Sequence, residues 1–131
     1  MLTFNLPLEV QVSAKKKFIL NLNNYRNTHF HVLNKSKVVY TEQVKSILAS
    51  ISTLKYDKIA LSYTLYPKDR RRKDVSNICS IVDKYFSDAL VEMGVIPDDD
   101  YEHVIGVQYL FGSIDKDNPR VEVEIIPIEE E

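Results

Sequence analysis

Two groups of charged residues carry the chemistry that this sequence offers. Four consecutive cations run directly into a carboxylate where a helix is expected to begin, in the order Arg70, Arg71, Arg72, Lys73, Asp74. Further along the chain stand three consecutive carboxylates, Asp98, Asp99 and Asp100. Arg and Lys hold phosphates, whereas Asp oxygens hold divalent cations, so the combination indicates metal-assisted hydrolysis of a polyanion.

The formal net charge of −2 conceals two halves of opposite sign. Residues 1–73 carry 14 Lys and Arg against 4 Asp and Glu, whereas residues 74–131 carry 3 against 15. Phosphate binding depends on local patches rather than on net charge, so this asymmetry favours a cationic surface for nucleic acid and a separate carboxylate group. Two ordinary solvated faces with an acidic tail are the alternative.

Length and composition predict one domain over residues 1–131, with a disordered acidic tail at about 127–131. The sequence shows no signal peptide and no window near the roughly 20 apolar residues of a membrane span, which predicts a cytoplasmic protein.

The lone Cys79 excludes an internal disulfide and is expected to pack in a helix. His29, His31 and His103 are too scattered for a zinc site, and no Gly-rich loop suits a nucleotide cofactor.

Periodicity predicts an α+β fold, a mixed β-sheet with two helices packed on it, in the order ββαβαββ. An edge strand is expected over residues 2–12, a second strand over 17–22, and an ordered loop or arm over 22–27. The remaining elements are a helix from 38 or 41 to 51, a strand at 58–66, a helix at 77–93 ended by Gly94, and strands at 103–111 and 120–126.

A specific resemblance emerges when these motifs are taken in order across residues 18–126. They are Asn24-Tyr25-Arg26, Tyr66-Pro67, the cationic run before Asp74 and Asn77, Asp88-Ala89-Leu90, Gly94, and Pro97-Asp98-Asp99. In this combination the chain resembles the RusA family of Holliday junction resolvases. The resemblance implies a homodimeric endodeoxyribonuclease of DNA recombination and repair, encoded in phages or prophages and active in the bacterial or phage-infected cytoplasm. It would bind Mg²⁺, which Mn²⁺ can replace, recognise branched DNA such as a four-way junction, and make paired nicks.

Motif matching places the family's metal-binding aspartates at Asp74 and Asp99. The chain departs from the family at Ser76, where a second aspartate is usual; Ser76 can offer a neutral oxygen, and Asp98 or Asp100 can compensate. A lysine usual one turn later is replaced by Ser80, and Lys84 stands a further turn along. A solvated pair of Asp83 and Lys84 is the alternative for that position.

The resulting mechanism has Mg²⁺ on Asp74 and Asp99 activating water against a scissile phosphate, with Asn77 and Lys84 as further catalytic candidates. The DNA contacts are expected to be indifferent to sequence and to come from Arg70, Arg71, Arg72, Lys73, Lys15, Lys16, Lys17, Asn24, Tyr25 and Arg26, with Tyr25 stacking at a branch point. Each has a structural alternative. Asp74 is also a good helix N-cap, Asn77 can satisfy first-turn amides, and Tyr25 can simply pack.

Helix geometry adds a constraint on the metal site. An unbroken helix over 77–93 separates Asp74 from the helix end by roughly 24 Å, and the six residues from Gly94 return at most ~20 Å. We therefore expect Asp74 of one chain to meet Asp98 to Asp100 of its partner, unless the helix breaks early. Two other functions remain open: a branched-DNA-binding protein without catalysis, for which Ser76 is the deciding residue, and a protein-binding regulator on the same scaffold.

Overall fold

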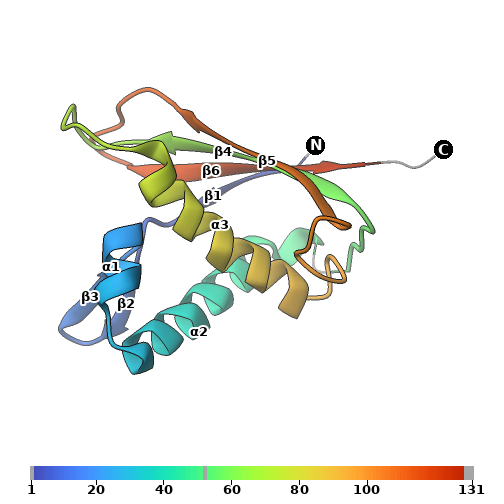
Figure 1. Ribbon diagram of the computed structural model, residues 1–131, viewed down its shortest axis with the longest axis horizontal. Helices are drawn as coiled ribbons and strands as arrows, with labels where there is room; N and C mark the ends of the chain where they lie inside the picture. The colour runs from blue at the N-terminus through green and yellow to red at the C-terminus, as the bar shows by residue number, and fades with distance from the viewer. Residues whose placement is uncertain (1, 52, 129–131) are drawn as a thin grey trace.

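The computed structural model describes residues 2–51 and 53–128, and its main layer is a four-stranded sheet in the order β1-β6-β4-β5 (Figure 1). The strands are β1 (Leu2–Leu6), β4 (Ile59–Tyr66), β5 (Val104–Phe111) and β6 (Arg120–Pro127). β4 pairs with β5 in parallel, and the other two pairings are antiparallel. The predicted α+β fold with a mixed sheet is therefore confirmed.

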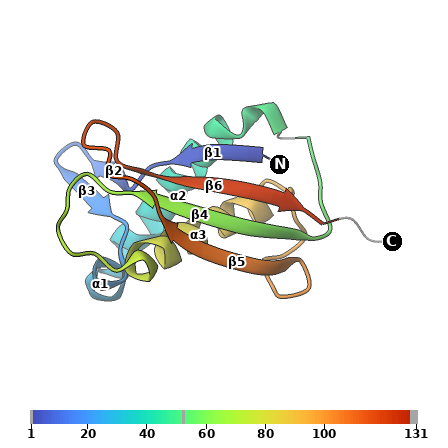
Figure 2. The same cartoon turned by 90° about the horizontal axis from the view of Figure 1, so that it is seen from above.

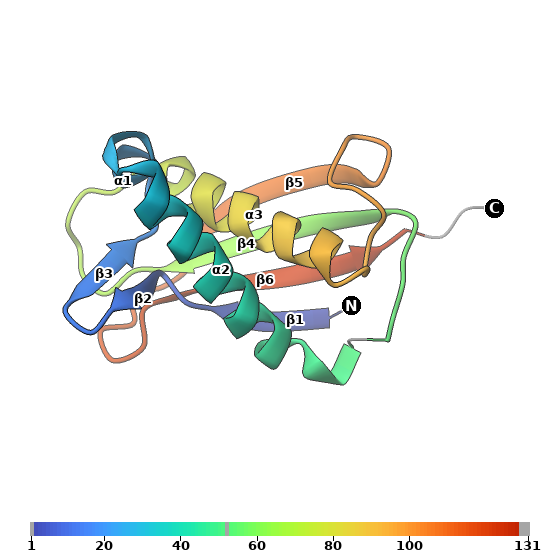
Figure 3. The same ribbon diagram turned by 90° about the horizontal axis from the view of Figure 1, so that it is seen from below.

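Helices cover one face of this sheet. α2 (Phe30–Ile47) and α3 (Val75–Glu92) lie across it, as the view from below shows (Figure 3). The core between the layers comes from alternate residues of the strands, because successive side chains of a strand point to opposite faces. Val121, Val123 and Ile125 of β6 are buried, whereas Glu122 and Glu124 between them are only half-buried.

The N-terminal segment differs from the prediction because Pro7 ends the first strand. Residues 2–12 form two strands, β1 in the main sheet and β2 (Glu9–Ser13), which leaves that sheet to pair with β3 (Lys16–Ile19). Pro7 has no N–H for a ladder, so the chain changes direction there. The view from above shows this hairpin at the end of the sheet where β4 also ends (Figure 2).

Two predictions about the helices were wrong. Residues 22–27, expected to be a loop or arm, form the short helix α1 (Leu22–Asn27), whose first turn is capped because the Asn21 side chain accepts a hydrogen bond from the Asn24 N–H at 2.7 Å. α2 begins at Phe30 rather than at 38 or 41, and the 3₁₀ helix η1 (Ala49–Ile51) follows it. The described part of the chain therefore forms three α-helices where two were expected.

α3 is confirmed as one unbroken helix of 18 residues. Asp74 caps its start, and Gly94, whose φ of 76° is accessible mainly to glycine, follows its end. Cys79 is fully buried on α3, and burial raises the pKa of its thiol to about 12. At the other end of the chain, Pro127 still belongs to β6 and the Ile128 N–H donates to the Lys58 carbonyl, so these two residues are ordered rather than part of a disordered tail. The rest of the predicted tail, residues 129–131, lies outside the described residues.

Asp83 on α3 is held by hydroxyl groups from β4, from β5 and from α3 itself. The Tyr63 hydroxyl donates to its Oδ1 at 2.7 Å, the Ser87 hydroxyl donates to the same oxygen at 3.0 Å, and the Tyr109 hydroxyl donates to Oδ2 at 3.3 Å. The pKa of Tyr63 is well above its ordinary value because of burial and the neighbouring Asp83 charge. The alternative of a solvated Asp83 on the outer helix face is therefore wrong.

Removing the Tyr63 hydroxyl is expected to destabilise the fold. Tyr63→Phe leaves the ring packed but withdraws the shortest donor from Asp83, and a hydrogen bond to a charged group contributes about 1.5–3 kcal/mol. We expect urea unfolding to give a free energy lower by that amount. Tyr109→Phe, which removes the longer bond, is the matched control, and an equal loss in both variants would contradict the unequal roles assigned to the two hydroxyls.

Candidate functional site

The cationic segment, residues 70–73, lies in the loop between β4 and α3 and is organised by Asp69. The Lys73 Nζ donates to Asp69 Oδ1 at 2.8 Å, and the Arg71 N–H donates to the same oxygen at 3.0 Å. The hydrogen bond from Lys73 is the main reason why the pKa of Asp69 is lowered. Lys73 is therefore an internal anchor of the loop rather than a free cation.

Arg70 and Arg72 differ from Lys73 in their freedom to bind a ligand. Both are exposed, and within residues 2–51 and 53–128 neither has an ion pair. Arg71 is also exposed, although its Nε lies 3.9 Å from Asp69 Oδ2. The loop therefore presents three guanidinium groups to solvent, two of them without a carboxylate partner among the described residues.

Asp74 directly follows these cations and caps α3. Its Oδ1 accepts the Ser76 N–H at 3.0 Å and the Ser76 hydroxyl at 2.8 Å. These two bonds lower the pKa of Asp74, so the exposed carboxylate is ionised at neutral pH. Its other oxygen, Oδ2, accepts no hydrogen bond from the described part of the chain. Asp74 can thus act as a cap and still offer one oxygen to a cation.

Several predicted site residues lie in α1 or contact it. Asn77 Oδ1 accepts the Leu22 N–H at 3.0 Å, which ties the start of α1 to the first turn of α3. The Lys84 ammonium lies 5.8 Å from the centre of the Tyr25 ring, which makes an edge-to-face contact with the Tyr85 ring. Asn24 also has a local role, because its Nδ2 donates to the Ile19 carbonyl. These contacts support structural roles, and the catalytic and DNA-binding roles of these residues stay predictions.

The β2–β3 hairpin, which carries Lys15, Lys16 and Lys17, lies at the same end of the molecule as the β4–α3 loop with the cationic segment (Figure 2). Lys15 and Lys16 are exposed near the β2–β3 turn, while Lys17 forms an ion pair with Glu9 at 3.3 Å. Arg26, near the end of α1, is exposed as well. The predicted phosphate-binding residues thus gather at one end, with Lys17 and Lys73 already engaged by carboxylates.

Asp98, Asp99 and Asp100 are exposed in the loop between α3 and β5. Desolvation, with the nearby Asp88 charge next in importance, raises the pKa of Asp99. Asp98 Oδ1 accepts the Asp99 N–H at 2.8 Å, and Asp100 Oδ1 accepts the Glu102 N–H at 3.1 Å. A carboxylate whose pKa is raised by neighbouring acids gains from a bound cation, so this loop is electrostatically suited to a metal ion.

Sequence reasoning missed the partners of Asp100. One ligand atom from each of Asp100, Glu102 and His103 lies within 4.8 Å of the others, close enough to share a metal ion. His103 Nδ1 also lies 2.8 Å from the Asp57 carbonyl, and this contact is the main cause of the raised pKa of His103. The sequence analysis compares His103 only with His29 and His31, whereas the structure groups it with Asp100 and Glu102.

The two candidate halves of the metal site stand at opposite ends of α3 (Figure 1). Asp74 caps the start of this helix, and residues 98–100 follow its end. Eighteen residues of unbroken helix span about 27 Å, whereas carboxylates that share one ion lie within a few Å of each other. Early breaking of the helix is therefore excluded, and Asp74 and Asp99 of one chain do not form one site.

No helix among residues 2–51 and 53–128 has the length and apolarity needed to cross a membrane. The chain matches no model of a known protein family and no curated protein at a significant level.

Proposed function

We propose that this chain is one subunit of a homodimeric, RusA-like endodeoxyribonuclease that cuts branched DNA with Mg²⁺ or Mn²⁺. The observation that carries the proposal is the ionised, exposed Asp74 placed directly behind exposed Arg70, Arg71 and Arg72 at the start of α3. Arginines would hold the phosphates that flank the scissile bond, and Asp74 would hold the metal ion. The remaining carboxylates would come from residues 98–100 of the partner subunit.

The edge strand β5 provides a surface for that partner. One side of β5 pairs with β4, and among residues 2–51 and 53–128 no strand lies beside its other backbone edge. Val107 and Phe111 share the helix-covered face of the sheet, since they are in register with buried Leu61 and Leu65, yet they are 42% and 51% exposed. An eight-residue edge strand with no charged side chain is suited to pairing with another strand.

A two-fold axis perpendicular to the sheet would pair β5 with β5 of a second copy in antiparallel fashion. Because α3 returns from the end of β4 to the start of β5, it runs opposite to both strands, so the start of each α3 would face the end of the other. Two strand spacings would set the helices about 10 Å apart, an ordinary packing distance. The cationic segment of each chain would then lie beside residues 98–100 of its partner, which is electrostatically favourable.

Each composite site would divide the chemistry between the two chains. A divalent ion held by Asp74 and by Asp99 of the partner subunit would lower the pKa of a bound water and offset the charge that develops on the phosphate. Asp98, Asp100 or Ser76 would complete the oxygen ligands. Two such sites per dimer would face different strands and would account for paired nicks.

Charge on the β5 edge is expected to separate the subunits. Val107→Lys places an ammonium at the centre of the proposed pairing, where the two-fold axis sets it against its own copy. Sedimentation velocity should show a dimer for the unaltered chain and a monomer for this variant, with loss of nicking. Val38→Lys, at a 60% exposed position on α2, should remain dimeric, and an unchanged dimer for Val107→Lys would exclude the β5 interface.

The direct test is cleavage of a labelled four-way junction, compared with linear duplex, in Mg²⁺, in Mn²⁺ and in EDTA. Metal-dependent paired nicks in the junction alone are the expected result. Junction binding without cleavage in any metal would favour the second candidate, a catalytically silent branched-DNA-binding protein. Ser76 is the observation behind that candidate, because its hydroxyl donates to Asp74 rather than adding a second negative ligand. Neither binding nor cleavage would leave a protein-binding regulator.

A further inference from the structure

Three aromatic rings are gathered at the start of α2. The centre of the Phe30 ring lies 4.0 Å from that of His31 and 4.8 Å from that of His29, and the two histidine rings lie 4.9 Å apart. All three residues are exposed, and 59% of Phe30 is open to solvent. We call residues 29–31 the aromatic tip. The start of α2 lies at the same end of the molecule as α1 and the β2–β3 hairpin (Figure 1, Figure 3).

The aromatic tip is separate from the core and from any larger apolar surface of its helix. Leu33, one turn further along α2, packs against the core, whereas Phe30 is not part of it. All residues of α2 are described, and Val38, about two turns from the tip, is its one other exposed large apolar side chain. A membrane-binding helix presents an apolar stripe along its length, whereas an isolated group of rings suits a flat partner that stacks on it.

The chain around the aromatic tip contains cations and no acids. Residues 10–41 include six Lys and Arg but no Asp or Glu. Arg26 and Lys35 are exposed and Lys37 is half-buried, and none of the three has an ion pair in the described part of the chain. Cations without carboxylate partners favour a polyanion. Flat rings beside such cations favour a nucleic acid, because its strand offers both phosphates and bases.

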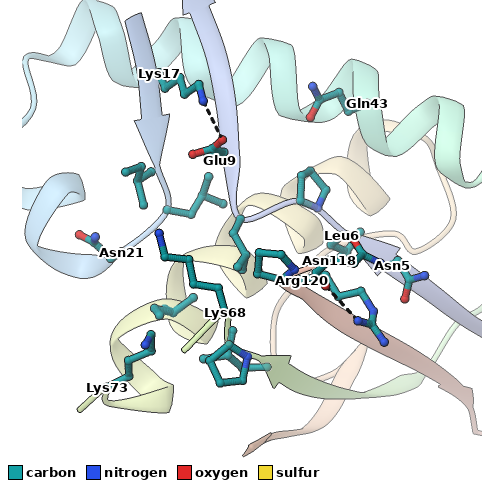
Figure 4. A pocket seen from close by; sticks show the side chains of 18 of the residues that line it. Asn5, Leu6, Glu9, Lys17, Asn21, Gln43, Lys68, Lys73, Asn118 and Arg120 are labelled. Atoms are coloured by element: carbon teal, nitrogen blue, oxygen red, sulfur yellow. Dashed lines mark hydrogen bonds and ion pairs between the residues drawn. The ribbon is translucent and has the colours of Figure 1, made fainter. Parts of the chain in front are cut away.

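Further cations link this surface with the cationic segment. Lys68, in the same loop as Arg70, is exposed and has no ion pair among the described residues. Its side chain reaches from the end of β4 toward the β2–β3 hairpin (Figure 4). Beside α1, the ammonium groups of Lys37 and Lys84 lie 5.5 Å and 5.8 Å from the centre of the Tyr25 ring. A strand held by the arginines would therefore meet further phosphate-binding groups at the end of the molecule that carries the aromatic tip.

We propose that the aromatic tip stacks on an unpaired base of the bound DNA, with Phe30 against the base and with Arg26 and Lys35 on the neighbouring phosphates. This inference rests on the proposed function and names the feature of branched DNA that the protein selects. Bases within a linear duplex are covered on both faces by their neighbours, whereas an opened branch point offers a free face. The selection would be indifferent to sequence, since every base has a π-face.

The test exploits the absence of tryptophan from the chain, because Phe30→Trp then carries a single indole whose fluorescence reports on the aromatic tip. A base stacked on an indole quenches its emission. A four-way junction and oligo(dT) should both quench this variant, whereas linear duplex should leave its emission nearly unchanged. Val38→Trp, at a 60% exposed position of the same helix, is the matched control and should keep its emission with every DNA.

A second variant measures what the stacking contributes to binding. Phe30→Ala should weaken the binding of the junction and of oligo(dT) about tenfold, within the range measured for one stacked base, and should leave duplex binding unchanged. The slope of log K against log salt should stay the same, because no phosphate contact is lost. Anisotropy of end-labelled DNA over a range of salt concentrations measures both quantities.

Oligo(dT) separates this inference from the proposed function, because its binding needs neither a junction nor a metal ion. Quenching of Phe30→Trp alone by oligo(dT) would support the aromatic tip even if no junction were cut. Junction cleavage without quenching would overturn the tip and leave the nuclease proposal intact. Equal quenching of both tryptophan variants would also overturn it, since it would report only general proximity to DNA. Vesicles of phosphatidylcholine and phosphatidylserine form the last arm. A blue shift of Phe30→Trp with these vesicles, without quenching by DNA, would assign the tip to a membrane surface and overturn the proposal.

Discussion

The variants Asp74→Asn and Asp99→Asn are each expected to lose junction cleavage by about 10²–10³-fold, because each change would remove a negative ligand from the proposed metal site. Folding should be preserved in the first variant, since Asn caps a helix as well as Asp does. The informative experiment mixes the two inactive proteins after brief unfolding and refolding. In a composite site, each mixed dimer carries one site with both substitutions and one site with none.

The mixture should therefore regain activity that neither variant has alone. Random association makes half of the dimers mixed, each with one intact site of two, so about a quarter of the full nicking rate is expected, as single rather than paired nicks. Junction nicking resolved on denaturing gels measures both quantities. A mixture of Asp74→Asn with Asp74→Asn,Asp99→Asn, which contains no intact composite site, is the matched control. Recovery in neither mixture would show that the two aspartates do not meet across subunits.

Replacing both Arg70 and Arg72 with Gln is expected to reduce junction affinity by tens of fold at low salt. Each phosphate contact contributes about 0.9 to the slope of log K against log salt, so the double variant should lower the magnitude of that slope by about 1.8. The loss should be similar for any sequence, since phosphate contacts do not read bases. Fluorescence anisotropy over a range of salt concentrations measures affinity and slope together.

Lys73→Gln provides the comparison within the same loop. The Lys73 ammonium already donates to Asp69 at 2.8 Å, so Lys73 should displace fewer counterions from DNA than either arginine does. Lys73→Gln should therefore change the slope of log K against log salt less than the loss of an arginine. Its loss should instead free Asp69 and loosen the loop. Equal slope changes for all three cations would contradict the division between anchoring and phosphate-binding residues.

The strands of the main sheet and α3 could be predicted because their patterns are local. β6 alternates apolar and acidic residues, and α3 repeats apolar residues at helical spacing up to Gly94. The start of α2 could not be predicted in this way. Ser36 is fully buried there and bonds to the Tyr85 hydroxyl at 2.8 Å, so a polar residue interrupts the apolar repeat at a position that faces the core.

α1 escaped prediction for a related reason. Asparagine favours caps and turns, and residues 22–27 contain three of them, so local propensity indicated a loop. The helix is stabilised by tertiary contacts, including the Leu22 N–H bond to Asn77 on α3, 55 residues away. Intrinsic propensity is a weak guide where a distant side chain supplies the hydrogen bond.

In the candidate site, too, features set by neighbouring residues could be predicted, whereas features set by tertiary contacts could not. Asp74 as the cap of a helix behind a cationic run was readable from neighbouring residues. Two other features depend on how loops fold, which cannot be predicted from the periodicity of the sequence. They are the hydrogen bond from Lys73 to Asp69 and the group formed by Asp100, Glu102 and His103. Asp83 was misplaced because its hydroxyl partners Tyr63 and Tyr109 come from two strands of the sheet.

The burial of Cys79 makes the folded protein equivalent to a cysteine-free background. Alkylating reagents and oxidants attack the thiolate, and a fully buried thiol with a pKa of about 12 offers neither access nor charge. A single cysteine introduced on the surface would therefore react alone, without prior removal of the native one. Probes for distance measurements or crosslinks along the β5 edge can thus be attached to the otherwise unaltered sequence.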